Sequence, residues 1–313
     1  MTFPYSSNAI HITPDTTDVV VTLTTTRELV DSAASHGTAV PAFNVISLEH
    51  AEGVVDGIES AGSSALLQIS ENTALFHGGR FAPLVAACAQ IASHSTAAIA
   101  IHLDHFRSID LLEEAIATAS SLGATSIMVD AAHLDYGDNI SRTTSLTRDA
   151  HAAGLWVEAE LGEIGGKDGI VLDAHAPGAR TDPDDAAAFV AATGVDALAV
   201  AVGSSHAMSS RTAQLDIDLL SRLCGRVSVP LVLHGSSGVP DDMIRSAVDA
   251  GIRKVNVGTA LNLSFTAAVR GAMRAEPSAH DPRTYLSAGR AAVSETVAHF
   301  CRSIDSVRAV SGR

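Results

Sequence analysis

The sequence predicts an α/β fold, a (β/α)8 barrel of the TIM type with an N-terminal extension and an extra C-terminal helix. Two observations lead to this prediction. Eight short apolar runs recur along the 313 residues, and amphipathic helical stretches fill most of the intervals between them. A chain of this length, 46% hydrophobic, can form one barrel of about 250 residues with short additions. We therefore expect an extension at residues 1–23 and a single barrel domain at residues 24–313.

The strands and helices alternate along the chain. The predicted strands are the apolar runs at residues 39–45, 64–70, 97–105, 126–131, 156–161, 197–203, 230–235 and 254–259. The predicted helices after them lie at residues 48–61, 80–94, 109–122, 140–153, 183–193, 217–223, 241–250 and 261–273. Glycines that follow helix ends, where a left-handed residue is common, are Gly62, Gly123, Gly154, Gly194, Gly225 and Gly251.

Two further helices lie outside the eight units. Residues 24–26 can cap a helix at residues 27–35, which Gly37 stops and which we expect to close the bottom of the barrel. Residues 282–307 predict a final helix that packs on the barrel or reaches a neighbouring subunit. Two long loops, at residues 162–181 and 204–214, are typical of lids or binding loops.

The composition limits the kinds of partner and the cellular compartment that we expect for this protein. A formal net charge of −15 argues against nucleic acid or an anionic membrane as a partner, so an anionic ligand would need local donors. Cys88, Cys224 and Cys301 lack metal-ligand spacing, which favours reduced thiols in a cytoplasmic protein. Residues 1–22 do not resemble a signal peptide, and no apolar run reaches the ~18 residues of a membrane span.

Histidines stand at the ends of three predicted strands. The third strand ends in His102-Leu103-Asp104-His105, and three ionisable groups in a buried strand are costly unless they are paired or bind metal. His206 follows the sixth strand and His234 ends the seventh. Singly, these two could be a surface-loop histidine and a turn-capping histidine. Together with His105 they predict a zinc site with an open position at the C-terminal rim. Glu160, at the end of the fifth strand, is an alternative ligand or an orienting partner.

Two small-residue loops follow the seventh and eighth strands, where phosphate sites are common in this fold. Their backbone amides and hydroxyls can coordinate phosphate without net positive charge. Lys254 either adds charge there or faces solvent at the bottom of the barrel. The residues of the two loops are Gly235, Ser236, Ser237 and Gly238 in the first and Asn256, Val257, Gly258 and Thr259 in the second.

At these positions the chain resembles the class II, metal-dependent ketose-bisphosphate aldolases, the fructose- and tagatose-bisphosphate aldolase family. The matching segments run in family order over nearly the whole chain from about residue 25, and the shorter tagatose-type branch fits this length better. They are residues 40–45, 102–105, 157–162 with Gly165 and Gly166, 199–206, 231–238 and 254–259.

The resemblance implies a zinc-dependent lyase of carbohydrate metabolism, such as glycolysis. It would reversibly cleave a ketose 1,6-bisphosphate to dihydroxyacetone phosphate and glyceraldehyde 3-phosphate. His105, His206 and His234 would bind Zn²⁺, and Asp104 would be the acid/base at the C4 oxygen. The phosphate would be held by the two loops, with Asn44 and Ser70 lining the pocket and a monovalent cation, Na⁺ or K⁺, nearby. The resemblance also implies a homodimer or homotetramer.

The chain departs from the family pattern at two places. Ala207 replaces the glycine that usually follows the second zinc histidine, which puts a methyl group near the substrate. The loop after Gly165 and Gly166 lacks the glutamate that usually removes the C3 proton, so Asp168 is the natural substitute and Glu163 a weaker one.

Four other functions are alternatives to this one. A metal-dependent barrel hydrolase would favour His-x-His on the first strand, which this chain lacks. A lysine Schiff-base aldolase would need Lys167 or Lys254, and neither ends an apolar strand. A non-catalytic scaffold should have lost ligands, yet the three histidines and Asp104 are present. An aldolase for another phosphorylated ketose remains the closest alternative.

Overall fold

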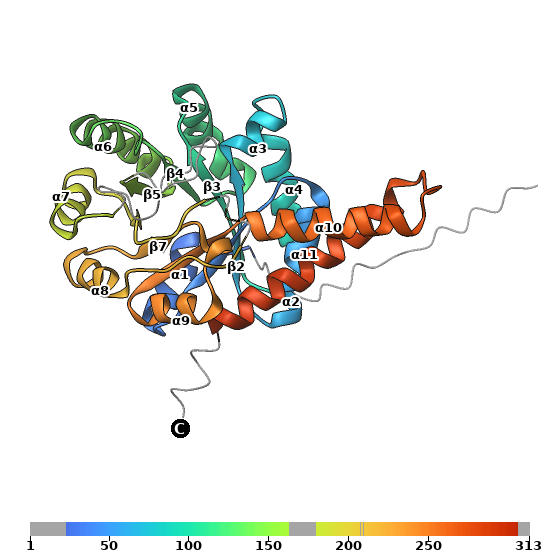
Figure 1. Ribbon diagram of the computed structural model, residues 1–313. Coiled ribbons are helices and arrows are strands. Elements are labelled where there is room, and N and C mark those ends of the chain that lie inside the picture. Colours follow the sequence, from blue (N-terminus) through green and yellow to red (C-terminus); the bar gives the residue numbers. More distant parts are fainter. Residues whose placement is uncertain (1–22, 163–179, 207, 209, 306–313) are drawn as a thin grey trace, which may run out of the picture.

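The structure, a computed structural model, describes residues 23–162, 180–206, 208 and 210–305 (Figure 1). Eight parallel strands pair in chain order, and β8 pairs with β1 to close the barrel, which confirms the predicted (β/α)8 fold. The strands are β1 Val40–Asn44, β2 Ala65–Ser70, β3 Ile99–Phe106, β4 Ser126–Val129, β5 Trp156–Leu161, β6 Ala197–Val200, β7 Leu231–Leu233 and β8 Ile252–Val257. The predicted extension at residues 1–23 lies outside the described residues except for Leu23, which forms a bridge to Ile99.

Helices surround the barrel and bury their apolar faces against the outer side of the strands. The helices that follow strands are α2 Leu48–Ala61, α3 Glu71–Phe76, α4 Ala82–Ala92, α5 Ile109–Thr118 with the short η1 Ala119–Leu122, α6 Tyr136–Ala152, α7 Pro183–Thr193, α8 Ile217–Arg226, η3 Ser236–Gly238, α9 Asp241–Asp249 and α10 Thr259–Ala275. Helix α3 was not predicted, although Ser70 caps it by accepting a hydrogen bond from the Thr73 amide.

Helix α1 (Thr26–Ser35) closes the bottom of the barrel, as predicted. A capping box starts it, because the Thr25 hydroxyl accepts from the Glu28 amide while the Glu28 carboxylate accepts from the Thr25 amide. Val30 of α1 is fully buried in a cluster with Met128 and Trp156 inside the barrel. The opposite, C-terminal end of the barrel is therefore the end available to ligands.

Two of the predicted element boundaries that differ from the structure change how a residue is interpreted. Helix α8 continues through Gly225 to Arg226, so Gly225 is an ordinary helical residue, whereas the other five glycines expected after helix ends all have positive φ. Strand β8 begins at Ile252, two residues before its predicted start, which makes Lys254 its third residue. The Lys254 side chain is fully buried inside the barrel, so the interpretation of Lys254 as a solvent-facing residue fails.

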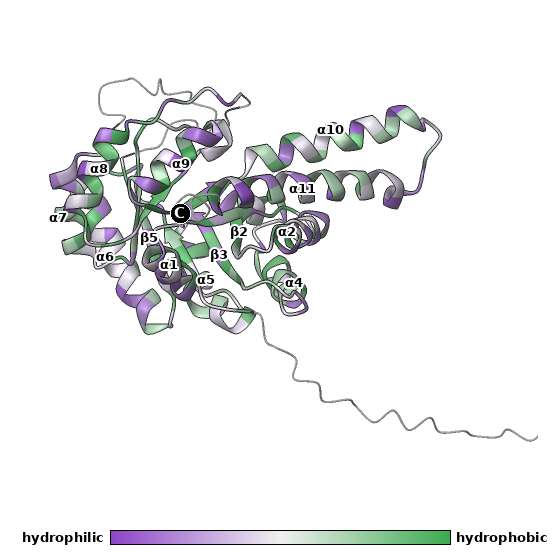
Figure 2. Cartoon of the chain, turned by 90° about the horizontal axis from the view of Figure 1, so that it is seen from below, coloured by the Kyte–Doolittle hydropathy of each residue, from purple (hydrophilic) through white to green (hydrophobic). Residues whose placement is uncertain are grey.

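The last helix, α11 (Pro282–Asp305), runs beside α10 as a hairpin that projects from the barrel (Figure 2). Its inner half packs on α2, where glycine permits close contact: a Cβ at Gly57 would come within 2.7 Å of Val297. The predicted C-terminal helix is thus confirmed, and it packs on the barrel. Within the described residues, none of the helices is both long and apolar enough to cross a membrane.

Candidate metal and substrate site

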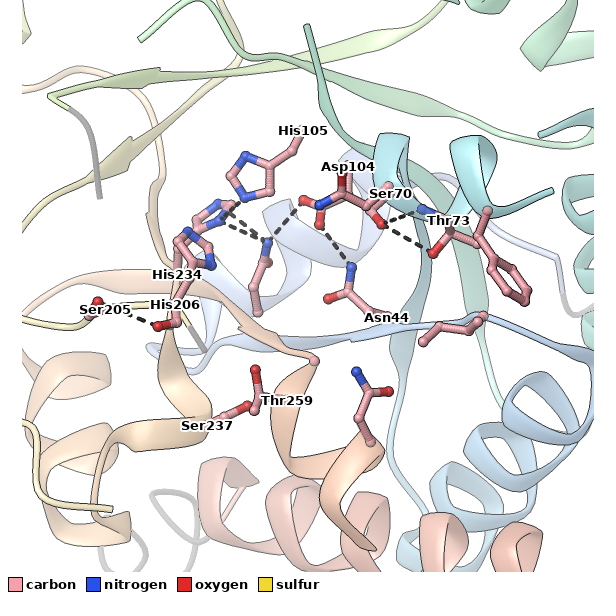
Figure 3. A pocket seen from close by; sticks show the side chains of 17 residues that line it. Asn44, Ser70, Thr73, Asp104, His105, Ser205, His206, His234, Ser237 and Thr259 are labelled. Atoms are coloured by element: carbon pink, nitrogen blue, oxygen red, sulfur yellow. Dashed lines mark hydrogen bonds between the residues drawn. The ribbon is translucent and has the colours of Figure 1, made fainter. Parts of the chain in front are cut away.

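A cavity of about 510 Å³ opens at the C-terminal ends of the strands (Figure 3). Eleven of the residues predicted from sequence line it, although they come from six different segments of the chain. These are Asn44, Ser70, Asp104, His105, His206, His234, Gly235, Ser237, Asn256, Gly258 and Thr259. The barrel therefore gathers the predicted strand-end residues at one place, as parallel strands with a common rim must do.

The three predicted histidines converge on one side of this cavity (Figure 3). One imidazole nitrogen from each of His105, His206 and His234 lies within 4.8 Å of the others. The ring centroids of His105 and His234 are 4.6 Å apart, and those of His105 and His206 are 5.1 Å apart. Three imidazoles so arranged can hold one divalent ion and leave a coordination position facing the cavity.

Buried carboxylates orient two of these imidazoles. His105 Nδ1 donates to Asp130 Oδ2 at 3.0 Å, and His234 Nε2 donates to Glu158 Oε1 at 2.8 Å. With a proton on each carboxylate-bonded nitrogen, His105 Nε2 and His234 Nδ1 lie 2.9 Å apart, and each neutral ring turns an acceptor nitrogen toward the other. Two acceptor nitrogens this close need a proton or a metal ion between them. The donor set therefore fits a metal ion such as Zn²⁺, whose protein ligands are commonly neutral histidines with carboxylate partners.

Glu160, predicted as an alternative ligand, lies on the other side of His105. Its Oε2 is 3.8 Å from His105 Nδ1, the nitrogen that Asp130 also contacts. Glu160 thus groups with His105 and Asp130 as a second set of potential ligands, which shares only His105 with the three-histidine set. The Glu160 carboxylate therefore lies near His105 Nδ1, the nitrogen whose bond to Asp130 orients the imidazole.

The backbone is strained at His105. Its φ of +54° is the only positive value among the described residues other than glycine. A histidine in the left-handed region costs free energy that the surrounding structure must offset, and such residues cluster at functional sites. Gly235 also has positive φ, and an added Cβ there would lie 2.5 Å from the Ser205 carbonyl oxygen. The loops that carry His206 and His234 therefore pack closely against each other.

A buried ion pair lies beneath the histidines. Lys254 Nζ is 2.8 Å from Glu158 Oε2, and both side chains are fully buried. Burial raises the pKa of Glu158, but Lys254 and the bond from His234 outweigh burial and lower it, so Glu158 is an ionised acceptor for His234. Burial and the charge of Lys254 lower the pKa of nearby His102 to about 3, which keeps that imidazole neutral. The pairing of Lys254 with Glu158 was not predicted from the sequence.

Asp104 is held by two amides at the edge of the cavity. Asn44 Nδ2 donates to its Oδ2 at 2.9 Å, and Asn256 Nδ2 donates to its Oδ1 at 3.3 Å. Burial raises the Asp104 pKa, but His105, His234 and Lys254 together hold it below its ordinary value, so the group is ionised at neutral pH. The Asn256 oxygen accepts from Lys254 at 2.7 Å, so this side chain bonds both Asp104 and Lys254.

The predicted phosphate loops meet at the start of α10. Ser237 and Thr259 lie together in the cavity, on the side away from Ser70 and Thr73 (Figure 3). Gly258 is the N-cap of the 17-residue helix α10, and the Ala260 amide in its first turn donates to Ser237 Oγ at 3.0 Å, which ties the two loops together at the edge of the cavity.

Besides Glu160, several residues predicted for the site do not line the cavity or lie outside the described residues. Ser236 is fully buried and donates to the Leu233 carbonyl, and the Val257 side chain belongs to the hydrophobic core. Asp168 and Ala207 lie outside the described residues, as does Glu163. Asp130, which orients His105, was missed as a functional residue, although its position at the end of β4 was a usable signal.

The fold and the cavity together define a parallel barrel protein with an imidazole-rich site of the kind that binds a divalent metal. The profile of the family described as class-II fructose-bisphosphate aldolase matches residues 24–308. The chain belongs to this family.

Solved structures give the same assignment. The YdjI aldolase from Escherichia coli K12 is 32% identical with a TM-score of 0.77, and the match covers 91% of this chain and 98% of that one. Fructose-bisphosphate aldolase (Fba) from Campylobacter jejuni is 21% identical with a TM-score of 0.76, covering 90% of this chain and 95% of that one. The second similarity is evidence for the shared fold alone.

Proposed function

We propose that this protein is a zinc-dependent aldolase that reversibly cleaves a phosphorylated ketose to dihydroxyacetone phosphate and an aldehyde. The observation that carries the proposal is the convergence of three imidazoles, in which His105 Nε2 and His234 Nδ1 lie 2.9 Å apart while carboxylates bond the other nitrogens of both rings. The expected substrate is a fructose- or tagatose-type 1,6-bisphosphate, and the alternative is another phosphorylated ketose. Both need the same metal and C1-phosphate sites.

His105, His206 and His234 would hold the ion. When bound, Zn²⁺ supplies positive charge that polarises the substrate carbonyl and stabilises negative charge developing on its oxygens. Asp104 is ionised and fixed by Asn44 and Asn256, so it can take the proton from the C4 hydroxyl during cleavage and return it during condensation.

The substrate's C1 phosphate is assigned to the amides and hydroxyls around Gly235, Ser237, Gly258 and Thr259, with a Na⁺ or K⁺ ion beside it. Helix N-termini and adjacent turn amides bind phosphate without a side-chain cation. We assign removal of the C3 proton to Asp168, and the proposal includes a homodimer or homotetramer in the cytoplasm.

A lysine Schiff-base mechanism is disfavoured by the position of Lys254. Its ammonium group is fully buried, paired with Glu158 and absent from the cavity lining. Borohydride added with substrate should therefore leave activity intact, whereas covalently trapped substrate on Lys254 or Lys167 would contradict the proposal.

Metal removal tests the proposed function directly. We expect dialysis against a chelator to abolish both aldol cleavage and the exchange of the C3 proton of dihydroxyacetone phosphate with solvent. One equivalent of Zn²⁺ per chain should restore both, and Mg²⁺ should not, because imidazole ligands favour zinc. Full activity in protein shown by elemental analysis to contain no metal would refute the proposal.

Asp104→Ala should separate the two halves of the reaction. Without its acid/base, the variant should lose carbon–carbon cleavage by about 10²- to 10⁴-fold. It should retain stoichiometric zinc and still exchange the C3 proton, because neither needs Asp104. Cleavage kinetics, proton exchange by NMR and metal content measure the three quantities, and wild-type cleavage in the variant would eliminate the assigned role.

A further inference from the structure

One wall of the cavity is formed by helix α3 and the segment after β1. Ile46, Asn72, Thr73 and Phe76 line the cavity from this wall. Phe76 is 73% exposed, although large aromatic side chains are usually buried. Thr73 of this wall lies on the opposite side of the cavity from Ser237 and Thr259, where the C1 phosphate is assigned (Figure 3). The α3 wall therefore faces the part of the substrate farthest from that phosphate.

No lysine or arginine is among the described residues that line the cavity. The ionisable side chains in the lining are Asp104 and the three histidines, which all lie at the reacting centre. Arg80, just after α3, donates its Nε to the His77 carbonyl at 3.2 Å, and Arg107 donates to Asp130 at 3.0 Å.

The first turn of α3 offers little to an anion. The Ser70 hydroxyl accepts from the Thr73 amide at 3.2 Å and shares a second bond with the Thr73 hydroxyl at 3.1 Å. A second phosphate on this wall would lie beside Phe76 and Ile46 with no lysine or arginine among the described lining residues to pair with it, in a chain of net charge −15.

We propose that the aldehyde half of the substrate is an uncharged hydroxyaldehyde, so that the ketose carries one phosphate, at C1, and none at its far end. This inference rests on the proposed aldolase function and selects between its two substrate alternatives. The Phe76 ring provides an apolar surface for the C–H face of a sugar chain, and the amides of Asn72 and Asn262 can bond its hydroxyls.

A matched pair of aldehydes tests the inference. Condensation of dihydroxyacetone phosphate is measured with D-glyceraldehyde and with D-glyceraldehyde 3-phosphate, which differ only in the phosphate. We expect kcat/KM for D-glyceraldehyde to equal or exceed kcat/KM for D-glyceraldehyde 3-phosphate. A preference for the phosphorylated aldehyde of more than threefold would overturn the inference, since a charge-assisted phosphate contact is worth about 10-fold or more.

A pair of variants tests whether the aldehyde half of the substrate lies beside α3. Phe76→Arg should raise the preference for the phosphorylated aldehyde about fivefold by placing a cation on this wall. Leu75→Arg is the matched control, because Leu75 is exposed on the same helix but does not line the cavity, and it should change the preference less than twofold. Equal effects of both variants, or none from Phe76→Arg, would contradict the placement of the aldehyde beside α3.

Proton exchange separates the two proposals. Exchange of the C3 proton of dihydroxyacetone phosphate needs no aldehyde. If the zinc-loaded protein does not exchange this proton, both the aldolase function and the inference that depends on it are refuted. Exchange combined with a strong preference for the phosphorylated aldehyde would refute the inference alone.

Discussion

Replacing Lys254 by methionine is expected to lower the free energy of unfolding by about 3–5 kcal/mol. The reason is that Glu158, fully buried and 2.8 Å from the Lys254 ammonium, would lose this paired charge while remaining in the barrel interior. The substitution keeps the apolar stem, so lost packing contributes little. Chemical denaturation of the metal-free protein, with wild type and variant in the same chelator, measures the difference.

The pH dependence of this difference has a definite sign. In the wild type the lowered Glu158 pKa contributes stability that is present above the ordinary glutamate pKa and lost as pH falls toward the lowered value. In the variant burial raises the Glu158 pKa, so protonation on acidification relieves the penalty. The difference in the free energy of unfolding between wild type and variant should therefore become smaller as the pH falls from 7 to 5.

Two controls identify the cause. The double variant Lys254→Met with Glu158→Gln should recover most of the loss, because a neutral amide still accepts the His234 bond. Arg290→Met removes an exposed ion pair with Glu52 at a similar distance, 2.7 Å, and should change stability by less than about 1 kcal/mol. A Lys254→Met effect as small as that of Arg290→Met would show that the buried pair is not the source of stability we infer.

His105→Ala is expected to abolish zinc retention rather than merely slow turnover. His105 supplies one of three imidazole nitrogens that lie within 4.8 Å of one another, and two remaining histidines make a much weaker site. Affinity should fall by more than the about 10- to 100-fold expected when only an orienting partner is lost. Elemental analysis after dialysis and competition with a chromophoric chelator measure it.

Graded variants make this prediction specific. Asp130→Asn leaves the imidazole in place but weakens its orienting bond of 3.0 Å, so it should cost only about 10- to 100-fold in affinity. His299→Ala removes an exposed histidine paired with Asp241 far along α11 and should leave metal content unchanged. Stoichiometric zinc in a folded His105→Ala protein would eliminate the three-histidine site.

Much of the fold and of the candidate site could be predicted because the signals are local. Apolar runs separated by amphipathic helices specify the barrel, and parallel strands send their C-terminal residues to one rim. His105, His206 and His234 each follow or end such a run, so their meeting follows from the topology alone. Gly225 was misassigned for the same local reason, because glycine after an apolar helix is ambiguous until α8 is seen to continue to Arg226.

The tertiary structure decided which groups are partners. The pairing of Lys254 with Glu158 depends on the register of β8. The predicted start of that strand was two residues too late, so the pairing could not be predicted. The bond from His105 to Asp130 and the positive φ of His105 come from the meeting of β3 and β4, where the register shifts between Leu103 and Phe106.

The sequence by itself determined that this chain forms a (β/α)8 barrel and carries histidines and small-residue loops at one end, because strand period and strand-end position are properties of consecutive residues. The orientation of each imidazole, the ion pair beneath them and the uncharged wall bearing Phe76 were decided by packing between distant segments. Distances between side chains depend on strand register and helix placement, which no stretch of the sequence specifies alone.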